Sequence, residues 1–119
     1  MMIEIYGLKN CDRCRAALKW LKSQELEARF HDVRQDGFPE KEARKWITVL
    51  GTDSAINRRS TTWRQLPPAR RASNMTTEEA LALLKEFPAL LKRPVIEIEG
   101  AVLIGFDDDV KTEIKRIAT

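Results

Sequence analysis

The fold is decided by a stretch near the N-terminus, residues 2–22, which reads MIEIYGLKNCDRCRAALKWLK. It opens with a strand-like pattern, passes through a turn at residues 7–10 and continues as a helix over residues 15–22. Cys11 and Cys14 lie between the turn and the helix. A thiol at a helix N-terminus faces unpaired backbone N–H groups and the positive end of the helix dipole, which favour the reactive thiolate. We therefore predict a reactive pair, because Cys14 is one helical turn away and able to form or resolve a disulfide at Cys11.

Two other interpretations of the cysteine pair stay open. The cysteines can be small apolar core residues, or they can be half of a metal site. A zinc site needs four ligands, and the chain has no further cysteine and a single histidine, His31. We favour a redox pair and expect no metal, because C-x-x-C near a βαβ pattern is typical of redox proteins. His31 lies within a predicted strand and is interpreted as structural.

Composition limits the class of protein. A chain of 119 residues with 43% hydrophobic and 33% charged residues predicts a globular protein with one core. No apolar run approaches the ~20 residues of a membrane span, and no signal-peptide pattern is found, so we expect a cytoplasmic protein without membrane contact. The net charge of +3 permits anionic ligands. Direct binding of nucleic acid is not expected, because no basic run is interleaved with aromatic residues.

The rest of the sheet is predicted from both ends of the chain. Residues 28–33 alternate small or apolar with polar residues and predict a second strand. Two strands joined by a helix of about 12 residues form a βαβ unit with a parallel pair. Residues 95–98 and 101–104 predict a hairpin around a Glu-Gly turn. Three aspartates at residues 107–109 are expected to begin a terminal helix.

The middle of the chain is predicted to be helical. Pro39 suits the first turn of a helix that Gly51 ends. Residues 52–66 are polar and rich in arginine, and they predict a loop or a broken helix. Thr76 is expected to cap a further helix, which Pro88 ends. The order is βαβ, a helical stretch and ββα, so we predict an α/β protein with the mixed four-stranded sheet of the thioredoxin/glutaredoxin fold.

Four motifs connect this pattern with a known family: YGLKNC at residues 6–11, RSTTWR at 59–64, KRP at 92–94 and LIGF at 103–106. With these motifs, the chain resembles the arsenate reductase-like (ArsC/Spx/YffB) branch of the thioredoxin-like superfamily over essentially its whole length. The resemblance implies a single domain, residues 1–119, in which residues 38–90 form a helical insertion between the second and third strands.

The resemblance also implies a set of site residues. Cys11 matches the nucleophilic cysteine of the family, and Arg93 matches the arginine that holds an oxyanion or a thiolate near it. Pro94 matches the family's cis-proline, which the fold places against the active-site loop. Arg64 aligns with a second anion-binding arginine of the arsenate reductases, and Arg59 with an arginine shared by the Spx and YffB branches. The implied substrate- or anion-binding residues are therefore Asn10, Arg59, Arg64 and Pro94.

Two departures separate this chain from the arsenate reductases that it resembles. Those enzymes bring a third arginine to the site from the strand near the C-terminus, where this chain has Gly105. One guanidinium fewer weakens the binding of a tetrahedral oxyanion, so arsenate reduction itself is in question. The second departure is Cys14, which the glutathione/glutaredoxin-dependent arsenate reductases lack and the Spx-like regulators have.

Two functions of different classes follow from the resemblance. The first is a monomeric thiol–disulfide oxidoreductase without a bound cofactor, in which Cys14 resolves the intermediate formed at Cys11. Its partner would be glutathione as co-substrate, or a thioredoxin/glutaredoxin-type protein. The alternative is an Spx-like regulator that binds the C-terminal domain of the RNA polymerase alpha subunit, with the cysteine pair as sensor. Residues 51–53 resemble Spx, whereas residues 59–64 are more similar to YffB, and we favour the enzyme.

Overall fold

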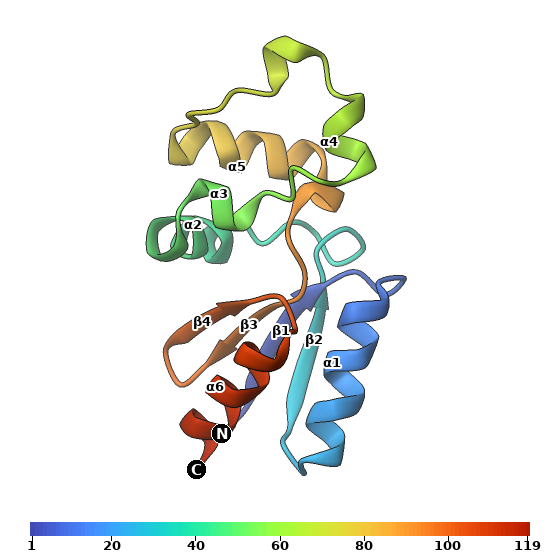
Figure 1. Cartoon of the computed structure of the whole chain (residues 1–119), viewed down its shortest axis with the longest axis vertical. Helices are drawn as coiled ribbons and strands as arrows, with labels where there is room; N and C mark the ends of the chain where they lie inside the picture. Colours follow the sequence, from blue (N-terminus) through green and yellow to red (C-terminus); the bar gives the residue numbers. More distant parts are fainter. The chain divides into compact units, whose positions relative to one another are not determined.

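The computed structural model describes all residues from 1 to 119, and the chain divides into two compact units (Figure 1). Unit 1 comprises residues 1–37 and 93–119 and contains the β-sheet. Unit 2 comprises residues 38–92 and is helical, so the chain enters it after the second strand and leaves it before the third. The helices are at most 12 residues long, and none has the length and apolar character that crossing a membrane requires.

The sheet of unit 1 has four strands, in the order β2-β1-β3-β4. The strands β1 and β2 pair in parallel, whereas β3 is antiparallel to both β1 and β4. This mixed sheet with its helices confirms the predicted α/β, thioredoxin-like fold. The elements of unit 1 are β1 (Ile3–Gly7), α1 (Asp12–Ser23), β2 (Ala28–Asp32), β3 (Val95–Ile98), β4 (Ala101–Ile104) and α6 (Asp108–Ala118).

One face of the sheet carries the core of unit 1. Alternate residues of a strand point to the same face, and Ile3 and Ile5 of β1 are therefore buried together with Ile96 and Ile98 of β3. The helices α1 and α6 cover this face through apolar side chains that include Leu21, Val110 and Ile114. Burial of each such side chain contributes about 1.5–3 kcal/mol, so this layer is the main support of the sheet.

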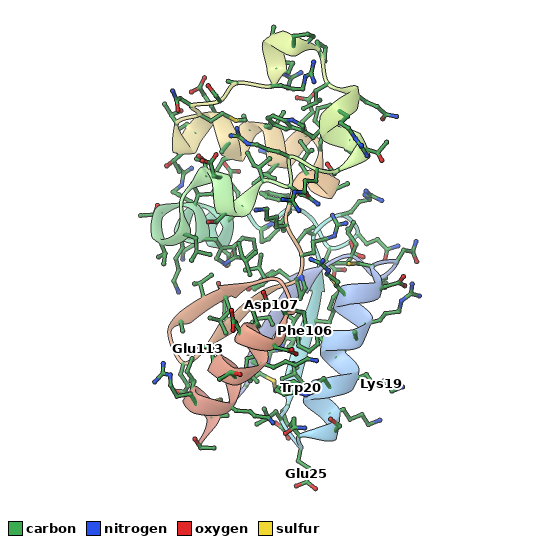
Figure 2. All side chains as sticks on the ribbon, in the orientation of Figure 1. Lys19, Trp20, Glu25, Phe106, Asp107 and Glu113 are labelled. Carbon is green, nitrogen blue, oxygen red and sulfur yellow. The ribbon has the colours of Figure 1, made fainter.

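The rim of this layer is aromatic. Trp20 of α1 and Phe106, which follows β4, meet edge to face with ring centroids 5.8 Å apart (Figure 2). Lys111 and Lys115 of α6 lie over the Phe106 and Trp20 rings, respectively. Asp107 accepts a hydrogen bond of 2.9 Å from the Val110 N–H, which fixes the start of α6 beside this pair.

The other face of the sheet is polar at β1 and β2. The His31 ring stacks on Tyr6 with centroids 4.5 Å apart, and its Nε2 lies 2.8 Å from Glu4 Oε1. The parallel register places Tyr6 directly beside His31. These contacts support the structural interpretation of His31.

Unit 2 is built from short helices around Trp46, which is fully buried. Thr76 and Glu79 form a capping box at the start of its last long helix, as the sequence predicted for Thr76. The stretch 52–66 is a broken helix, whereas the two single-turn 3-10 helices were not predicted. The elements are α2 (Glu40–Leu50), α3 (Thr52–Ala55), α4 (Thr61–Gln65), η1 (Pro68–Arg70), α5 (Thr77–Glu86) and η2 (Pro88–Leu90).

Close packing of α1 on β1 depends on Gly7, the last residue of β1. A Cβ atom built at Gly7 would lie 2.3 Å from Cys14 Sγ, so a side chain at this position overlaps with the sulfur. We predict that Gly7→Ala lowers the free energy of unfolding by about 1–3 kcal/mol, the usual cost of overpacking. The measurement is urea unfolding of the purified protein.

The matched control is the same substitution in a Cys14→Ala background. Because the overlapping sulfur is then absent, Gly7→Ala should cost clearly less in that background. An equal cost in both backgrounds would mean that the sulfur is not what requires glycine at this position.

Candidate active site at the start of helix α1

Cys11 is held at the first turn of α1 by backbone hydrogen bonds on both sides. Its N–H donates to the Leu8 carbonyl at 3.1 Å, and its carbonyl accepts from the Arg15 N–H at 3.0 Å. Cys11 is the N-cap residue, with extended φ and ψ of −103° and 120°. The sulfur is therefore carried at the helix end where unpaired N–H groups and the dipole stabilise an anion.

The surroundings of Cys11 favour its thiolate. Partial burial by itself raises the pKa of the thiol, but three groups more than offset this. They are the backbone N–H of Cys14, which approaches the sulfur without a full capping hydrogen bond, the Arg93 guanidinium and the Cys14 thiol. The net result is that the pKa of Cys11 lies below its ordinary value.

The surroundings of Cys14, in contrast, favour its neutral thiol. Its side chain is buried, with 1% of its surface exposed, and this burial is the main reason that its pKa is raised to about 12. The negative charge of the Cys11 thiolate raises it further, while the Leu8 N–H and Arg93 act in the other direction. Both thiols are free in this structure. The two thiols, which are in hydrogen-bond contact, are therefore unequal: the pKa of Cys11 is lowered and that of Cys14 is raised.

Arg93 comes from the chain segment that precedes β3. It is half-buried, and the peptide bond that joins it to Pro94 is cis, as the resemblance implies. The Pro94 carbonyl accepts a hydrogen bond of 2.9 Å from the Gly105 N–H. Gly105 has a φ of +87° and an open space where a side chain would begin. Because the residue that follows β4 is glycine, this position supplies no arginine to the site.

Asp32 is a part of this region that the sequence analysis missed. It is buried at the end of β2, and its carboxylate accepts hydrogen bonds from the backbone N–H groups of Lys9, Arg34 and Gln35. Burial raises its pKa, but these N–H groups and the Lys9 charge outweigh the effect and hold the pKa below its ordinary value. The sequence did carry a signal for the position of Asp32, because parallel strands end at the same sheet edge and Asp32 is the last residue of the strand beside β1.

The remaining predicted site residues divide between the two units. Asn10 is exposed and directly precedes Cys11 in unit 1. Arg59 and Arg64 are exposed in unit 2, before and at the end of α4. Their neighbour Arg58 is less exposed, because its guanidinium lies 5.0 Å from the centre of the Trp63 ring and 2.9 Å from Asp53 Oδ1. Unit 1 thus brings Cys11, Cys14 and Arg93 together.

Arg93 should control how readily Cys11 ionises. We predict that Arg93→Met raises the midpoint of the pH profile for Cys11 alkylation and slows alkylation at pH 7, because a hydrogen bond and a positive charge are lost. Arg13→Met is the control, since Arg13 lies between the cysteines but is exposed and should leave the midpoint in place. Equal midpoints in all three proteins would show that Arg93 does not stabilise the thiolate.

Comparisons with known proteins agree with this fold. A profile of the ArsC family matches residues 6–114. A protein of Haemophilus influenzae, described only as uncharacterized, is 44% identical over 108 residues, which cover 90% of this chain and 93% of that protein. The global transcriptional regulator Spx 1 of Lactococcus lactis is 34% identical over 110 residues, covering 91% of this chain and 84% of the regulator.

A solved structure of a YFFB protein is similar to the whole fold. It superposes with a TM-score of 0.85 at 32% identity, and the match covers 93% of this chain and 96% of that one. The sheet order, the family match over most of the chain and these relatives lead to one conclusion. The chain belongs to the ArsC family of the thioredoxin-like superfamily.

Proposed function

We propose that this protein is a thiol–disulfide oxidoreductase with Cys11 as nucleophile and Cys14 as resolving thiol. The observation that carries the proposal is the position of the pair: Cys11 is the N-cap of α1, whereas Cys14 is buried against Gly7, and the pKa values of the two thiols shift in opposite directions. A nucleophile must be a thiolate near neutral pH, whereas a resolving thiol has to wait until an intermediate has formed. The lowered pKa of Cys11 and the raised pKa of Cys14 support this division of roles.

In the first step, the Cys11 thiolate attacks one sulfur of a disulfide substrate. A bond forms between Cys11 Sγ and that sulfur, the substrate S–S bond breaks, and the second sulfur leaves as a thiolate that takes a proton from water. In this proposal Arg93 stabilises the negative charge at the sulfur, and its interaction with Cys11 supports this role. The substrate disulfide is thereby half reduced and remains attached to Cys11.

In the second step, Cys14 gives up its proton and attacks Cys11 Sγ. A Cys11–Cys14 disulfide forms, the bond between Cys11 and the attached sulfur breaks, and that sulfur leaves as a thiolate that takes up a proton, so the substrate disulfide is fully reduced. Once Cys11 is in a mixed disulfide it no longer carries the charge that helps to raise the Cys14 pKa, and this pKa therefore falls. Two thiols of a reductant then return the pair to the reduced state.

The reductant that we propose is glutathione as a co-substrate, or a thioredoxin/glutaredoxin-type protein, acting on a monomer in the cytoplasm. A reducing compartment keeps such a pair in the free-thiol form from which the cycle starts. No tightly bound cofactor is needed, since the one pair of electrons passes from sulfur to sulfur throughout. Asn10, Arg59, Arg64 and Pro94 remain our candidates for binding the substrate or its anionic groups.

Arsenate is a poor candidate for the substrate. A tetrahedral oxyanion is held well by several guanidinium groups that form paired, charge-assisted hydrogen bonds. The position from which the resemblance implies a third arginine holds Gly105, at a φ that a residue with a side chain adopts only under strain. Reduction of an organic disulfide needs no such cage, which supports a disulfide substrate.

The second candidate is a redox-sensing regulator, and the relatives named Spx are the observation that favours it. In that case, oxidation of the Cys11–Cys14 pair would alter binding to a partner, which the resemblance identifies as the C-terminal domain of the RNA polymerase alpha subunit. The two candidates differ in a simple way. An oxidoreductase turns over a disulfide substrate, whereas a sensor needs to cycle only once for each signal.

The two cysteines should respond differently to mutation. We predict that Cys11→Ser reduces turnover of a glutathione-linked disulfide to the uncatalysed rate, because a serine hydroxyl is not ionised near pH 7. Cys14→Ser should keep part of the activity, since glutathione can replace Cys14 in the second step. The measurement is a coupled assay of glutathione oxidation.

Ser23→Ala is a suitable control for these variants, because Ser23 lies at the far end of α1. Full turnover in both cysteine variants would exclude the redox mechanism. A wild-type protein without turnover that binds the polymerase domain in only one redox state would favour the regulator.

A further inference from the structure

Asp32 is the only charged residue of the chain that is buried, with 3% of its surface exposed, and the proposed chemistry does not use it. Its Oδ1 accepts from the Arg34 and Gln35 N–H groups at 2.9 and 2.8 Å, and its Oδ2 accepts from the Lys9 N–H at 3.0 Å. Two of these bonds close the turn that follows β2. The third reaches the loop between β1 and α1, which is the loop that carries Cys11.

The bond to Lys9 acts on one particular peptide group. The carbonyl of Leu8 and the N–H of Lys9 belong to the same planar unit, so their directions are fixed relative to each other. This carbonyl accepts the hydrogen bond from the Cys11 N–H at 3.1 Å. One peptide plane therefore connects the Asp32 carboxylate on one side with the backbone of Cys11 on the other.

We propose that Asp32 is a positioning residue for the reactive thiol: by orienting the Leu8–Lys9 peptide it keeps Cys11 at the N-terminus of α1, within reach of Arg93. This inference rests on the proposed function in one respect, which is that Cys11 is the reactive thiol. Asp32 touches neither sulfur in this role and acts only through the loop. It is the residue by which β2 contributes to the site.

Loss of positioning and loss of the Asp32 charge would shift the pKa of Cys11 in opposite directions. A negative charge near a thiol disfavours the thiolate, so removal of the Asp32 charge by itself would lower the pKa of Cys11. Loss of positioning moves Cys11 away from the Cys14 N–H and Arg93, which lower that pKa now. The direction of the change therefore separates the two effects.

Two substitutions of Asp32 remove the bond to Lys9 while sparing the turn. In Asp32→Asn, the amide oxygen can still accept from the Arg34 and Gln35 N–H groups. The NH₂ group then points toward the Lys9 N–H, so two hydrogen-bond donors face each other. In Asp32→Ser, the hydroxyl can still accept from the turn but is too short to reach Lys9.

The matched control is Asp36→Asn. The Asp36 carboxylate accepts from the Asp32 N–H at 3.0 Å, in the same turn but without contact to Lys9. Asparagine keeps an acceptor there, and the substitution removes one negative charge, as Asp32→Asn does. The control therefore reproduces the loss of charge without releasing the loop.

The experiment measures the pH profile of Cys11 alkylation together with hydrogen exchange of the Lys9 amide by NMR. Both Asp32 variants should move the alkylation midpoint to higher pH and slow the reaction at pH 7 by about threefold or more, the effect of losing one hydrogen bond. Their Lys9 amide should exchange faster than in the wild type. Asp36→Asn should leave the midpoint in place or lower it. If the asparagine variant does not fold, the serine variant provides the same comparison.

Three results would overturn the positioning role. They are an unchanged midpoint in a folded Asp32 variant, an equal rise in Asp36→Asn, and an unprotected Lys9 amide in the wild type, which needs no variant at all. Failure of the proposed function has a different signature. It would be a wild-type Cys11 that titrates at or above ~8.5, the value of a free cysteine, whatever the Asp32 variants do.

Discussion

Parallel pairing of β1 with β2 is the constraint on which the candidate site depends. The register places Gly7 beside Asp32, so the two strands end at the same edge of the sheet and the loops that follow them meet there. A hydrogen bond of 2.9 Å from the Val33 N–H to the Gly7 carbonyl continues the pairing one residue further. The loop that carries Cys11 is therefore supported by a neighbouring strand and is not a free connection.

The same edge makes the two cysteines chemically different. Cys11 is half-buried at the N-terminal end of α1, whereas Cys14 is one turn further along the helix and lies against Gly7. Only a glycine at position 7 leaves room for the Cys14 sulfur. Burial of Cys14 keeps it neutral, and a neutral thiol can donate to the Cys11 thiolate. The inequality of the pair is thus a result of how closely α1 packs on β1.

Most of the fold could be predicted from local patterns in the sequence. The bounds of the hairpin agree with β3 and β4, because the alternation of side chains and the Glu-Gly turn are local features. The position of Cys11 at the start of α1 was likewise visible in the order of strand, turn and helix. These features depend on neighbours within a few residues, which a single sequence displays directly.

The features that escaped the sequence analysis are made by distant parts of the chain. The bond between Asp32 and Lys9 joins residues 23 positions apart, so the strand pairing indicates the sheet edge at which Asp32 lies but not this contact or its burial. The burial of Cys14 follows from its approach to Gly7 across two elements. Arg58 lies in the arginine-rich stretch 52–66, whose polar pattern gave no sign that its guanidinium would lie over the Trp63 ring. Each depends on packing that local propensity does not encode.

The central claim is that the packing of α1 on β1 makes Cys11 reactive and keeps Cys14 protected. The most direct test is competitive labelling of the wild-type protein with less than one equivalent of iodoacetamide at pH 7, with the two alkylated sites separated by tandem mass spectrometry. We predict that the label is found almost entirely on Cys11 in the native protein, and on both cysteines to a similar extent in urea. Native labelling of Cys14 at a rate equal to or above that of Cys11 would contradict the account.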